Sequence, residues 1–235
     1  LNFTRAAEEL HTTQPTISIQ CKQLAEIVGH PLIEQIGKRI YLTDTGNELL
    51  KTCRDIFDSL ARFEMLMSDK QGIKAGKLRL SVITTAKYFV PRLLGRLSNL
   101  YPGIEVSLNV VNRQRMLQRV SENLDDLYVL GLPPEHMEVH MEPFMENPLV
   151  VLAANDHPLA EVASISALRL SEETFLMREP GSGTRLATEQ FFAEHGLKCK
   201  IKMELGSNEA IKQAVAGGLG IAVLSAHTLA LERHA

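Results

Sequence analysis

Polar side chains that could hydrogen-bond to DNA bases lie along one face of a helix expected near the start of the chain. The helix is expected over 15–28, because Pro15 suits a first helical turn and Gly29 suits a helix end. A short helix over 5–10, capped by Thr4, precedes it and predicts a helix-turn-helix. The expected inward face consists of Ile17, Leu24, Ile27 and Val28. The other face presents Gln14, Thr16, Ser18 and Lys22, and its amide and hydroxyl groups suit base edges in a major groove.

A hairpin is expected directly after these helices. Two β-prone runs, 32–36 and 40–43, flank a turn that contains glycine. After a helix-turn-helix such a hairpin is a wing, and Lys38 and Arg39 at its tip are placed to contact phosphate or a minor groove. The alternative interpretation is a solvated hairpin tip.

A second group of reactive side chains joins an expected strand, 174–178, to an expected helix, 184–195. Glycines let the backbone approach a ligand closely, and a helix start offers free N–H groups. Hydroxyls and guanidinium groups add hydrogen bonds and positive charge for phosphate or carboxylate. The residues are Arg178, Gly181, Ser182, Gly183, Thr184 and Arg185. We expect an anion site here; the alternative is a glycine-rich connector with two solvated arginines.

Two further strand-to-helix corners are polar, namely Thr84-Thr85 and Ser207-Asn208. Each alone is typical of a helix cap. Ligands of open α/β sheets bind at the carboxyl ends of the strands, so three polar corners favour one shared effector site.

A long amphipathic helix is expected between the hairpin and the α/β part. Thr43 or Thr45 can cap it, the latter with Glu48 as a capping box. Apolar residues then alternate at spacings of four and three, the coiled-coil pattern: Leu49, Cys53, Ile56, Leu60, Phe63 and Met67. We expect a dimerisation helix, because a reader of two DNA half-sites needs a two-fold partner. The alternative is a helix that packs on its own domain.

From Lys77 onward, strands alternate with helices, which predicts parallel sheets. Strands are expected at 78–83, 104–110, 127–130, 148–153, 174–178, 201–205 and 221–225. The apolar run near Leu149 is interpreted as a crossing into a second lobe.

Composition is that of an ordinary globular protein: 235 residues, 45% hydrophobic, 23% charged and a formal net charge of −3. That charge argues against a strongly basic nucleic-acid coat, although a small DNA-reading head remains compatible with it. Cys21, Cys53 and Cys199 are expected to be reduced and mostly buried in a cytoplasmic protein. No apolar run is long enough for a membrane span and no signal peptide is expected.

Signals for an enzyme are weak. The eight histidines lack metal-ligand spacing, and no Ser/His/Asp or Cys/His arrangement is visible. Asp125-Asp126 is interpreted as a solvated turn rather than a catalytic acid pair. We therefore expect no enzyme activity, no catalytic residues, no metal and no cofactor.

The chain resembles the LysR-type transcriptional regulators. Phe3-Thr-Arg-Ala-Ala and Thr13-Gln-Pro-Thr-Ile-Ser18 resemble that family's DNA-binding head, and 31–43 resembles its wing and the start of its linker helix. Three segments, 84–91, 123–128 and 178–185, are similar to the CbbR/CmpR branch, which regulates rubisco and carbon-fixation operons.

The resemblance implies an α+β multi-domain fold, with the chain truncated at both ends. A winged helix-turn-helix domain at 1–42, lacking most of its first helix, is followed by a linker and dimerisation helix at 43–73. A two-lobed effector domain of periplasmic-binding-protein type II follows, with lobe I at 77–147, incomplete, and lobe II at 148–235.

The resemblance also implies function. Thr13, Gln14, Pro15, Thr16 and Ser18 would approach bases of a promoter inverted repeat in double-stranded DNA, with Lys22, Lys38 and Arg39 on the backbone. The protein would act as a dimer or tetramer, in contact with RNA polymerase, and would activate carbon-fixation genes. Its effector, bound between the lobes, would be a phosphorylated metabolite or NADPH.

One departure from the family concerns Ile19, which stands where many members have an arginine that contacts DNA. Three alternatives stay open: a LysR-type regulator of amino-acid or aromatic metabolism, a solute-binding protein with the same two-lobed fold, and a metabolic enzyme.

Overall fold

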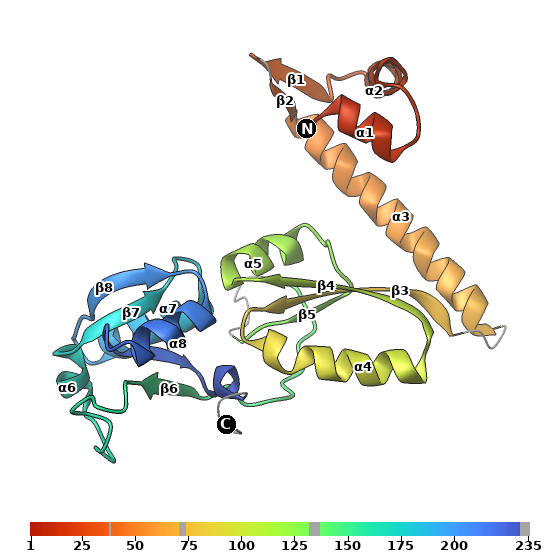
Figure 1. Ribbon diagram of the computed structural model, residues 1–235. Coiled ribbons are helices and arrows are strands. Elements are labelled where there is room, and N and C mark those ends of the chain that lie inside the picture. Colours follow the sequence, from red (N-terminus) through yellow and green to blue (C-terminus); the bar gives the residue numbers. More distant parts are fainter. Residues whose placement is uncertain (38, 71–73, 132–136, 231–235) are drawn as a thin grey trace. The chain divides into compact units, whose positions relative to one another are not determined.

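The computed structural model describes residues 1–37, 39–70, 74–131 and 137–230 (Figure 1). The chain divides into two compact units, Leu1–Ile73 and Lys74–Ala235, which are described separately below.

Unit 1 begins with two helices joined by a tight turn. They are α1 (Phe3–Glu9) and α2 (Gln14–Val28). The prediction that Thr4 caps the first helix is wrong: Asn2 Oδ1 accepts hydrogen bonds from the backbone N–H of Thr4 and of Arg5, at 2.8 and 3.1 Å. Asn2 has the extended backbone of an N-cap, whereas Thr4 is already helical. At the end of α2, Gly29 adopts φ 77°, a left-handed conformation that suits glycine at a helix terminus.

The wing hairpin and the long helix follow as expected. Strands β1 (Ile33–Ile36) and β2 (Arg39–Leu42) pair antiparallel, and α3 spans Asp44–Lys70. Of the two predicted caps, Thr43 is the one used. Its Oγ1 accepts from the Gly46 N–H at 3.0 Å and donates to the Pro31 carbonyl at 2.6 Å, so this one hydroxyl joins the helix start to the hairpin.

The first lobe of unit 2, as we call the part that contains β3 to β5, is a parallel sheet. Its strands, in the order β4-β3-β5, are β4 (Gly103–Val111), β3 (Ala75–Ile83) and β5 (Leu127–Val129). The helical elements are η1 (Ala86–Tyr88), α4 (Val90–Leu100) and α5 (Arg113–Ser121). Helices α4 and α5 cover opposite faces of the sheet (Figure 1). The central strand β3 is therefore the buried one, and Val82 is fully buried.

The second lobe contains β6 (Leu149–Leu152), α6 (Ala167–Ser171), β7 (Thr174–Arg178), α7 (Gly183–Glu194), β8 (Lys200–Leu205), α8 (Asn208–Ala216), β9 (Ala222–Ser225) and η2 (Ala226–Leu229). Strands β7 and β8 pair in parallel, as predicted. Strands β6 and β9 pair antiparallel, so the prediction of parallel sheets is wrong there. The reason is connectivity: β6 enters from the crossing segment, not from a strand-helix-strand unit of its own sheet, and its direction is free to oppose β9.

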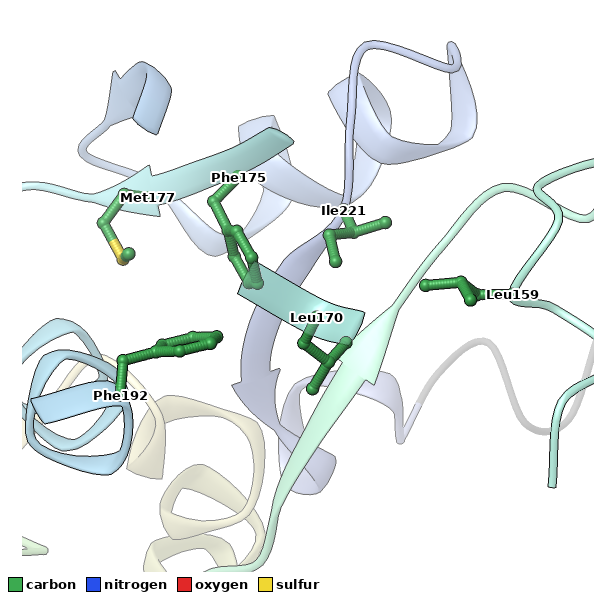
Figure 2. Close-up of a cluster of buried hydrophobic side chains, with 6 residues drawn as sticks. All are labelled: Leu159, Leu170, Phe175, Met177, Phe192 and Ile221. Atoms are coloured by element: carbon green, nitrogen blue, oxygen red, sulfur yellow. The ribbon is translucent and has the colours of Figure 1, made fainter. Parts of the chain in front are cut away.

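The core of the second lobe lies between β7, α6 and α7. Figure 2 shows Phe175 and Phe192 facing one another, with Leu170 beside them. The two rings meet edge to face, with centroids 5.4 Å apart. Such a pair contributes about 0.5–1.5 kcal/mol beyond its burial and fixes α7 against β7. Arg178 is the last residue of β7, so this core also holds the strand end at which the candidate site lies.

Candidate functional site

The polar face of α2 is open to solvent in unit 1. Gln14, Pro15 and Lys22 are exposed, and Thr16 and Ser18 are half-buried. Thr13 holds the helix start, because its Oγ1 accepts from the Thr16 N–H at 3.4 Å and lies 2.8 Å from the Thr16 hydroxyl oxygen. The capped first turn of α2 thus presents amide and hydroxyl groups to solvent.

The expected inward face of α2 is only partly correct. Ile17 is buried and Val28 is half-buried, but Leu24 is 42% exposed and Ile27 is 82% exposed. The expectation fails at Leu24 and Ile27 because the described part of unit 1 leaves these two side chains largely uncovered.

At the wing tip, Arg39 is exposed and lies opposite Ile36 in the hairpin register. Gly37 adopts φ 63° and its carbonyl accepts from Gln35 Nε2 at 2.9 Å, which closes the turn. Lys38 was predicted to contact DNA with Arg39, and it lies outside the described residues.

The predicted dimerisation positions form an uncovered stripe on α3. Leu49 and Cys53 are half-buried, and Ile56, Leu60, Phe63 and Met67 are exposed within unit 1. Leu50, Phe57 and Leu66 widen the exposed apolar surface. The alternative, a helix that packs on its own domain, leaves this surface without an explanation.

In unit 2, three predicted site residues from different elements meet around the guanidinium group of Arg178. Arg178 is only 2% exposed. Its Nη1 and Nη2 each donate to Thr84 Oγ1 at 3.3 Å, and Nη1 also donates to Asn208 Oδ1. Because β3 and β7 end at this point, the site combines the carboxyl ends of strands from both lobes.

Asn208 adds a donor group with no partner of its own. It is 2% exposed, and in the described structure its buried Nδ2 makes no hydrogen bond. A buried donor without a partner costs about 1–3 kcal/mol, so Asn208 Nδ2 would gain from a hydrogen bond to a ligand.

Glu179 and Asn112, which were not predicted, complete this cluster. The Glu179 carboxylate accepts from Arg178 Nε at 2.8 Å and Nη2 at 3.0 Å, and also from Asn112 Nδ2 at 3.3 Å. Asn112 is the N-cap of α5, where its Oδ1 accepts from the Arg115 N–H at 3.1 Å. A sequence signal was available, because Asn112 lies at a fourth strand-to-helix corner of the type already singled out.

The loop between β7 and α7, which contains Gly181, contacts the first lobe through its backbone. The Gln114 N–H donates to the Gly181 carbonyl at 3.0 Å. Gly181 adopts φ 85°, and a Cβ at this position would collide with the Gln114 side chain. Glycine is therefore required here by the contact between the lobes.

The remaining predicted residues of this loop belong to the start of α7. Ser182 is the N-cap and is buried, but its side chain makes no capping hydrogen bond. Gly183 and Thr184 form the first turn and are half-buried. The free N–H groups of this turn give the loop a positive end.

At the other two corners, Thr85 is buried and makes no side-chain cap, whereas Ser207 is exposed and caps α8 through the Ala210 N–H at 3.5 Å. Ser207 thus has the helix-cap role that the alternative interpretation assigned to it.

Arg185 has different partners from Arg178. Its guanidinium donates to Glu204 at 2.6 Å, to Glu189 at 2.8 Å and to the Arg178 carbonyl at 3.2 Å. These hydrogen bonds, Glu204 first, raise the pKa of Arg185 above its ordinary value. Its charge is compensated by two carboxylates, so it is not part of the polar cluster around Arg178.

The interpretation of Asp125-Asp126 as a solvated turn is wrong for Asp125. The Asp125 side chain is 1% exposed and forms a two-bond ion pair with Arg119, at 2.7 and 2.8 Å. Ser81 Oγ donates to it at 2.7 Å. Burial alone would raise the Asp125 pKa, but the bonds from Arg119 and Ser81 hold that pKa below its ordinary value. Through Ser81, which lies on β3, this ion pair ties α5 to the sheet of the first lobe.

The three cysteines are free, but each is only half-buried, so the expectation of mostly buried thiols is wrong. Burial raises the pKa of the Cys199 thiol to about 11. Among the described residues, no three His, Cys, Asp or Glu side chains come together as a metal site. None of the helices described here has the length and apolar character needed to cross a bilayer.

A helix-turn-helix with a wing, a long helix with an uncovered apolar stripe and a two-lobed α/β unit with a buried polar cluster define a class: DNA-binding regulators with a ligand-sensing domain. The family model for the bacterial regulatory helix-turn-helix protein, lysR family, matches residues 1–47, and the model for the LysR substrate binding domain matches residues 71–235. The chain belongs to the LysR family of transcriptional regulators.

Individual relatives are similar over nearly the whole chain. The HTH-type transcriptional activator CmpR of Synechocystis is 54% identical, over 98% of this chain and 76% of that protein. The RuBisCO operon transcriptional regulator of Acidithiobacillus ferrooxidans is 53% identical, over 99% of this chain and 75% of that protein. A solved structure, the regulatory domain of Synechocystis PCC6803 CcmR in complex with 2-PG, is 55% identical with a TM-score of 0.64, over 66% of this chain and 74% of that one.

Proposed function

We propose that this protein is a DNA-binding activator of carbon-fixation genes and that a small anionic metabolite controls it. Its relatives CmpR and the RuBisCO operon regulator support the pathway, and the 2-PG complex of CcmR supports the class of ligand. The observation on which the proposal rests is the buried Arg178, whose guanidinium lies at strand ends of both lobes beside the unpartnered Asn208 Nδ2.

The ligand would bind as an anion at this cluster. Arg178 would form charge-assisted hydrogen bonds to a phosphate or carboxylate group, with Thr84, Thr85, Asn208 and the α7 start around it. Gly181, Gly183 and Thr184 would supply backbone N–H groups, and Ser182 its hydroxyl, since the Ser182 N–H already donates to the Glu179 carbonyl at 3.2 Å. Ser207 would hold α8 in place. Arg185 would support the loop through its bond to the Arg178 carbonyl.

The DNA-binding surface would be the exposed start of α2 together with the wing. Thr13, Gln14, Pro15, Thr16 and Ser18 would approach base edges of an inverted repeat, with Lys22, Lys38 and Arg39 on phosphates. The apolar stripe of α3 would hold a second copy, and dimers would pair as tetramers that contact RNA polymerase.

The DNA-binding domain would span 1–42, the linker helix 43–73 and the two lobes 77–147 and 148–235. The protein would act in the cytoplasm, without enzyme activity and without a cofactor.

The test is fluorescence-anisotropy binding of the protein to labelled DNA from upstream of a rubisco operon. The titration is repeated with 2-phosphoglycolate, ribulose bisphosphate or NADPH at constant salt. We expect salt-sensitive binding that one of these anions changes. Binding to DNA beside its own gene only, without any metabolite response, would assign the protein to another pathway of the family.

A further inference from the structure

The guanidinium group of Arg178 already holds a carboxylate of its own chain. Both Glu179 oxygens accept from it, Oε2 from Nε at 2.8 Å and Oε1 from Nη2 at 3.0 Å. This two-bond geometry is the one in which arginine binds an external carboxylate or phosphate. The edge of Arg178 that suits an anion is therefore occupied.

We propose that Glu179 is an internal competitor for the ligand: its carboxylate occupies the place of the ligand's anionic group, and the ligand displaces it. This inference rests on the proposed ligand site. Two anions repel one another and cannot share the same guanidinium edge without a third positive group. The ligand and Glu179 are therefore alternatives at Arg178.

Burial decides which of the two side chains moves. The Arg178 side chain is 1% exposed and is bonded to Thr84 and Asn208, whereas the Glu179 side chain is 25% exposed. A carboxylate near solvent loses little when water replaces its partner, but a buried guanidinium loses much. Arg178 stays in place and Glu179 turns outward.

The ligand gains a bond that Glu179 does not make. In the described structure Nδ2 of Asn208 is buried without a hydrogen-bond partner, although Oδ1 of the same amide accepts from Arg178. A phosphate has more acceptor sites than a carboxylate, so it can bind the Arg178 edge and the Asn208 donor together. This additional bond favours an external anion over the internal one.

Displacement of Glu179 also breaks a contact between the two lobes. Asn112 of the first lobe donates to Glu179 Oε1 at 3.3 Å. When Glu179 leaves Arg178, this hydrogen bond is lost, while the Gln114-to-Gly181 backbone bond does not depend on Glu179. Ligand binding is thereby linked to the start of α5, through a change in the contacts that join the lobes.

The test is isothermal titration calorimetry of the full chain with 2-phosphoglycolate, at constant pH and ionic strength. Glu179→Gln keeps the size of the side chain and removes its charge, so we expect at least about tenfold tighter binding than wild type. The matched control is Glu189→Gln, which removes a carboxylate from Arg185 in the same lobe and should leave the affinity within about twofold of wild type.

Asn112→Ser is a second, independent variant. Serine keeps an acceptor that can cap α5, but its shorter side chain removes the amide donor that reaches Glu179. We expect about two- to threefold tighter binding. A general loss of structure cannot produce tighter binding, so the sign of both changes separates competition from a structural role.

Unchanged or weaker binding of 2-phosphoglycolate by Glu179→Gln would overturn the inference, and weaker binding would assign Glu179 to the positioning of Arg178. If Glu179→Gln does not fold, unchanged or weaker binding by Asn112→Ser overturns it. If neither wild type nor the variants bind any of the three metabolites, the proposed ligand site itself is wrong. These outcomes separate failure of the inference from failure of the proposed function.

Discussion

The two candidate binding surfaces of this protein hold their polar groups in opposite ways. On α2, Gln14 and Lys22 are exposed, whereas Arg178 and Asn208 in unit 2 are each 2% exposed and bonded to one another. A large partner such as DNA removes water from exposed groups when it docks. A small anion cannot do this alone, so its partners must be desolvated and arranged in advance.

Within unit 2 a second contrast separates a structural polar cluster from a binding one. Each Asp125 carboxylate oxygen accepts hydrogen bonds from its neighbours, whereas the cluster at Arg178 leaves Asn208 Nδ2 without a partner. A completed cluster stabilises the fold, and an incomplete one has capacity for a ligand. Substitutions should therefore affect binding alone on α2, stability alone at Asp125 and both at Arg178.

The largest effect is expected at Arg178, because this side chain contributes to both ligand binding and stability. Arg178→Gln removes the guanidinium and leaves Asn208 and Glu179 without their main donor. We expect loss of at least about 100-fold in 2-phosphoglycolate affinity and about 2–3 kcal/mol of unfolding free energy. Calorimetry and urea denaturation measure the two quantities. If the folded variant keeps its affinity for 2-phosphoglycolate, Arg178 is not part of the ligand site.

At Asp125 we expect a large loss of stability without any loss of binding. Asp125→Asn leaves Arg119 without its carboxylate and should lower the unfolding free energy by about 3 kcal/mol at pH 7, with 2-phosphoglycolate affinity unchanged. Asp126→Asn is the control, because Asp126 and Arg79 form an ion pair that is more than a third exposed, and about 0.5 kcal/mol is expected.

The pH dependence at Asp125 has a definite sign. The folded-state pKa of Asp125 lies below its ordinary value, so its contribution is fully present above the unfolded pKa of about 4 and is lost as the pH falls through the folded value. Urea denaturation of wild type and Asp125→Asn from pH 7 to pH 3 should show converging stabilities. If the difference in unfolding free energy between wild type and Asp125→Asn stays constant over this pH range, the Asp125 pKa is not lowered in the folded state.

On α2 we expect substitutions to weaken DNA binding without a loss of stability, the reverse of the expectation at Asp125. Gln14→Ala should weaken binding to the specific operator about tenfold and change the unfolding free energy by less than about 0.5 kcal/mol, because the side chain is exposed. Lys22→Ala serves as the comparison: it should weaken specific and unrelated DNA alike and reduce the salt slope by about 1. If Gln14→Ala weakens binding to specific and unrelated DNA equally, Gln14 contacts the DNA backbone and not a base.

The sequence predicted where helices and strands lie along the chain better than it predicted which elements they pair with or pack against. Strand β7 begins and ends where its apolar run predicts, since alternating strands and helices have a strong periodicity. The antiparallel pairing of β6 was missed because a short apolar run does not indicate the direction of its neighbour. The exposure of Ile27 was missed because amphipathicity indicates which face is apolar, and not whether another element covers it.

For the candidate site, residue types were predictable and pairings were not. Thr84, Arg178 and Asn208 could be grouped because each lies where a strand meets a helix. Glu179 could not be assigned, since an acidic residue beside an arginine in sequence can point toward it or into solvent. Asp125 was misjudged for the same reason: Arg119 is only six residues away and could equally point into solvent, and Ser81 lies 44 residues away on a strand that only the folded sheet brings near.

The smallest effect is expected at Arg185, seven residues after Arg178 and of the same chemical type. Both arginines could serve an anion when judged from sequence, but Arg185 is bonded to Glu204 and Glu189, each almost half exposed. Arg185→Gln should therefore change 2-phosphoglycolate affinity less than about threefold and cost about 0.5–1 kcal/mol of stability, the usual range for such pairs. Calorimetry beside Arg178→Gln measures the difference directly. A loss comparable to that of Arg178→Gln would mean that the ligand draws Arg185 away from both glutamates, and the two arginines would then act together on one anion.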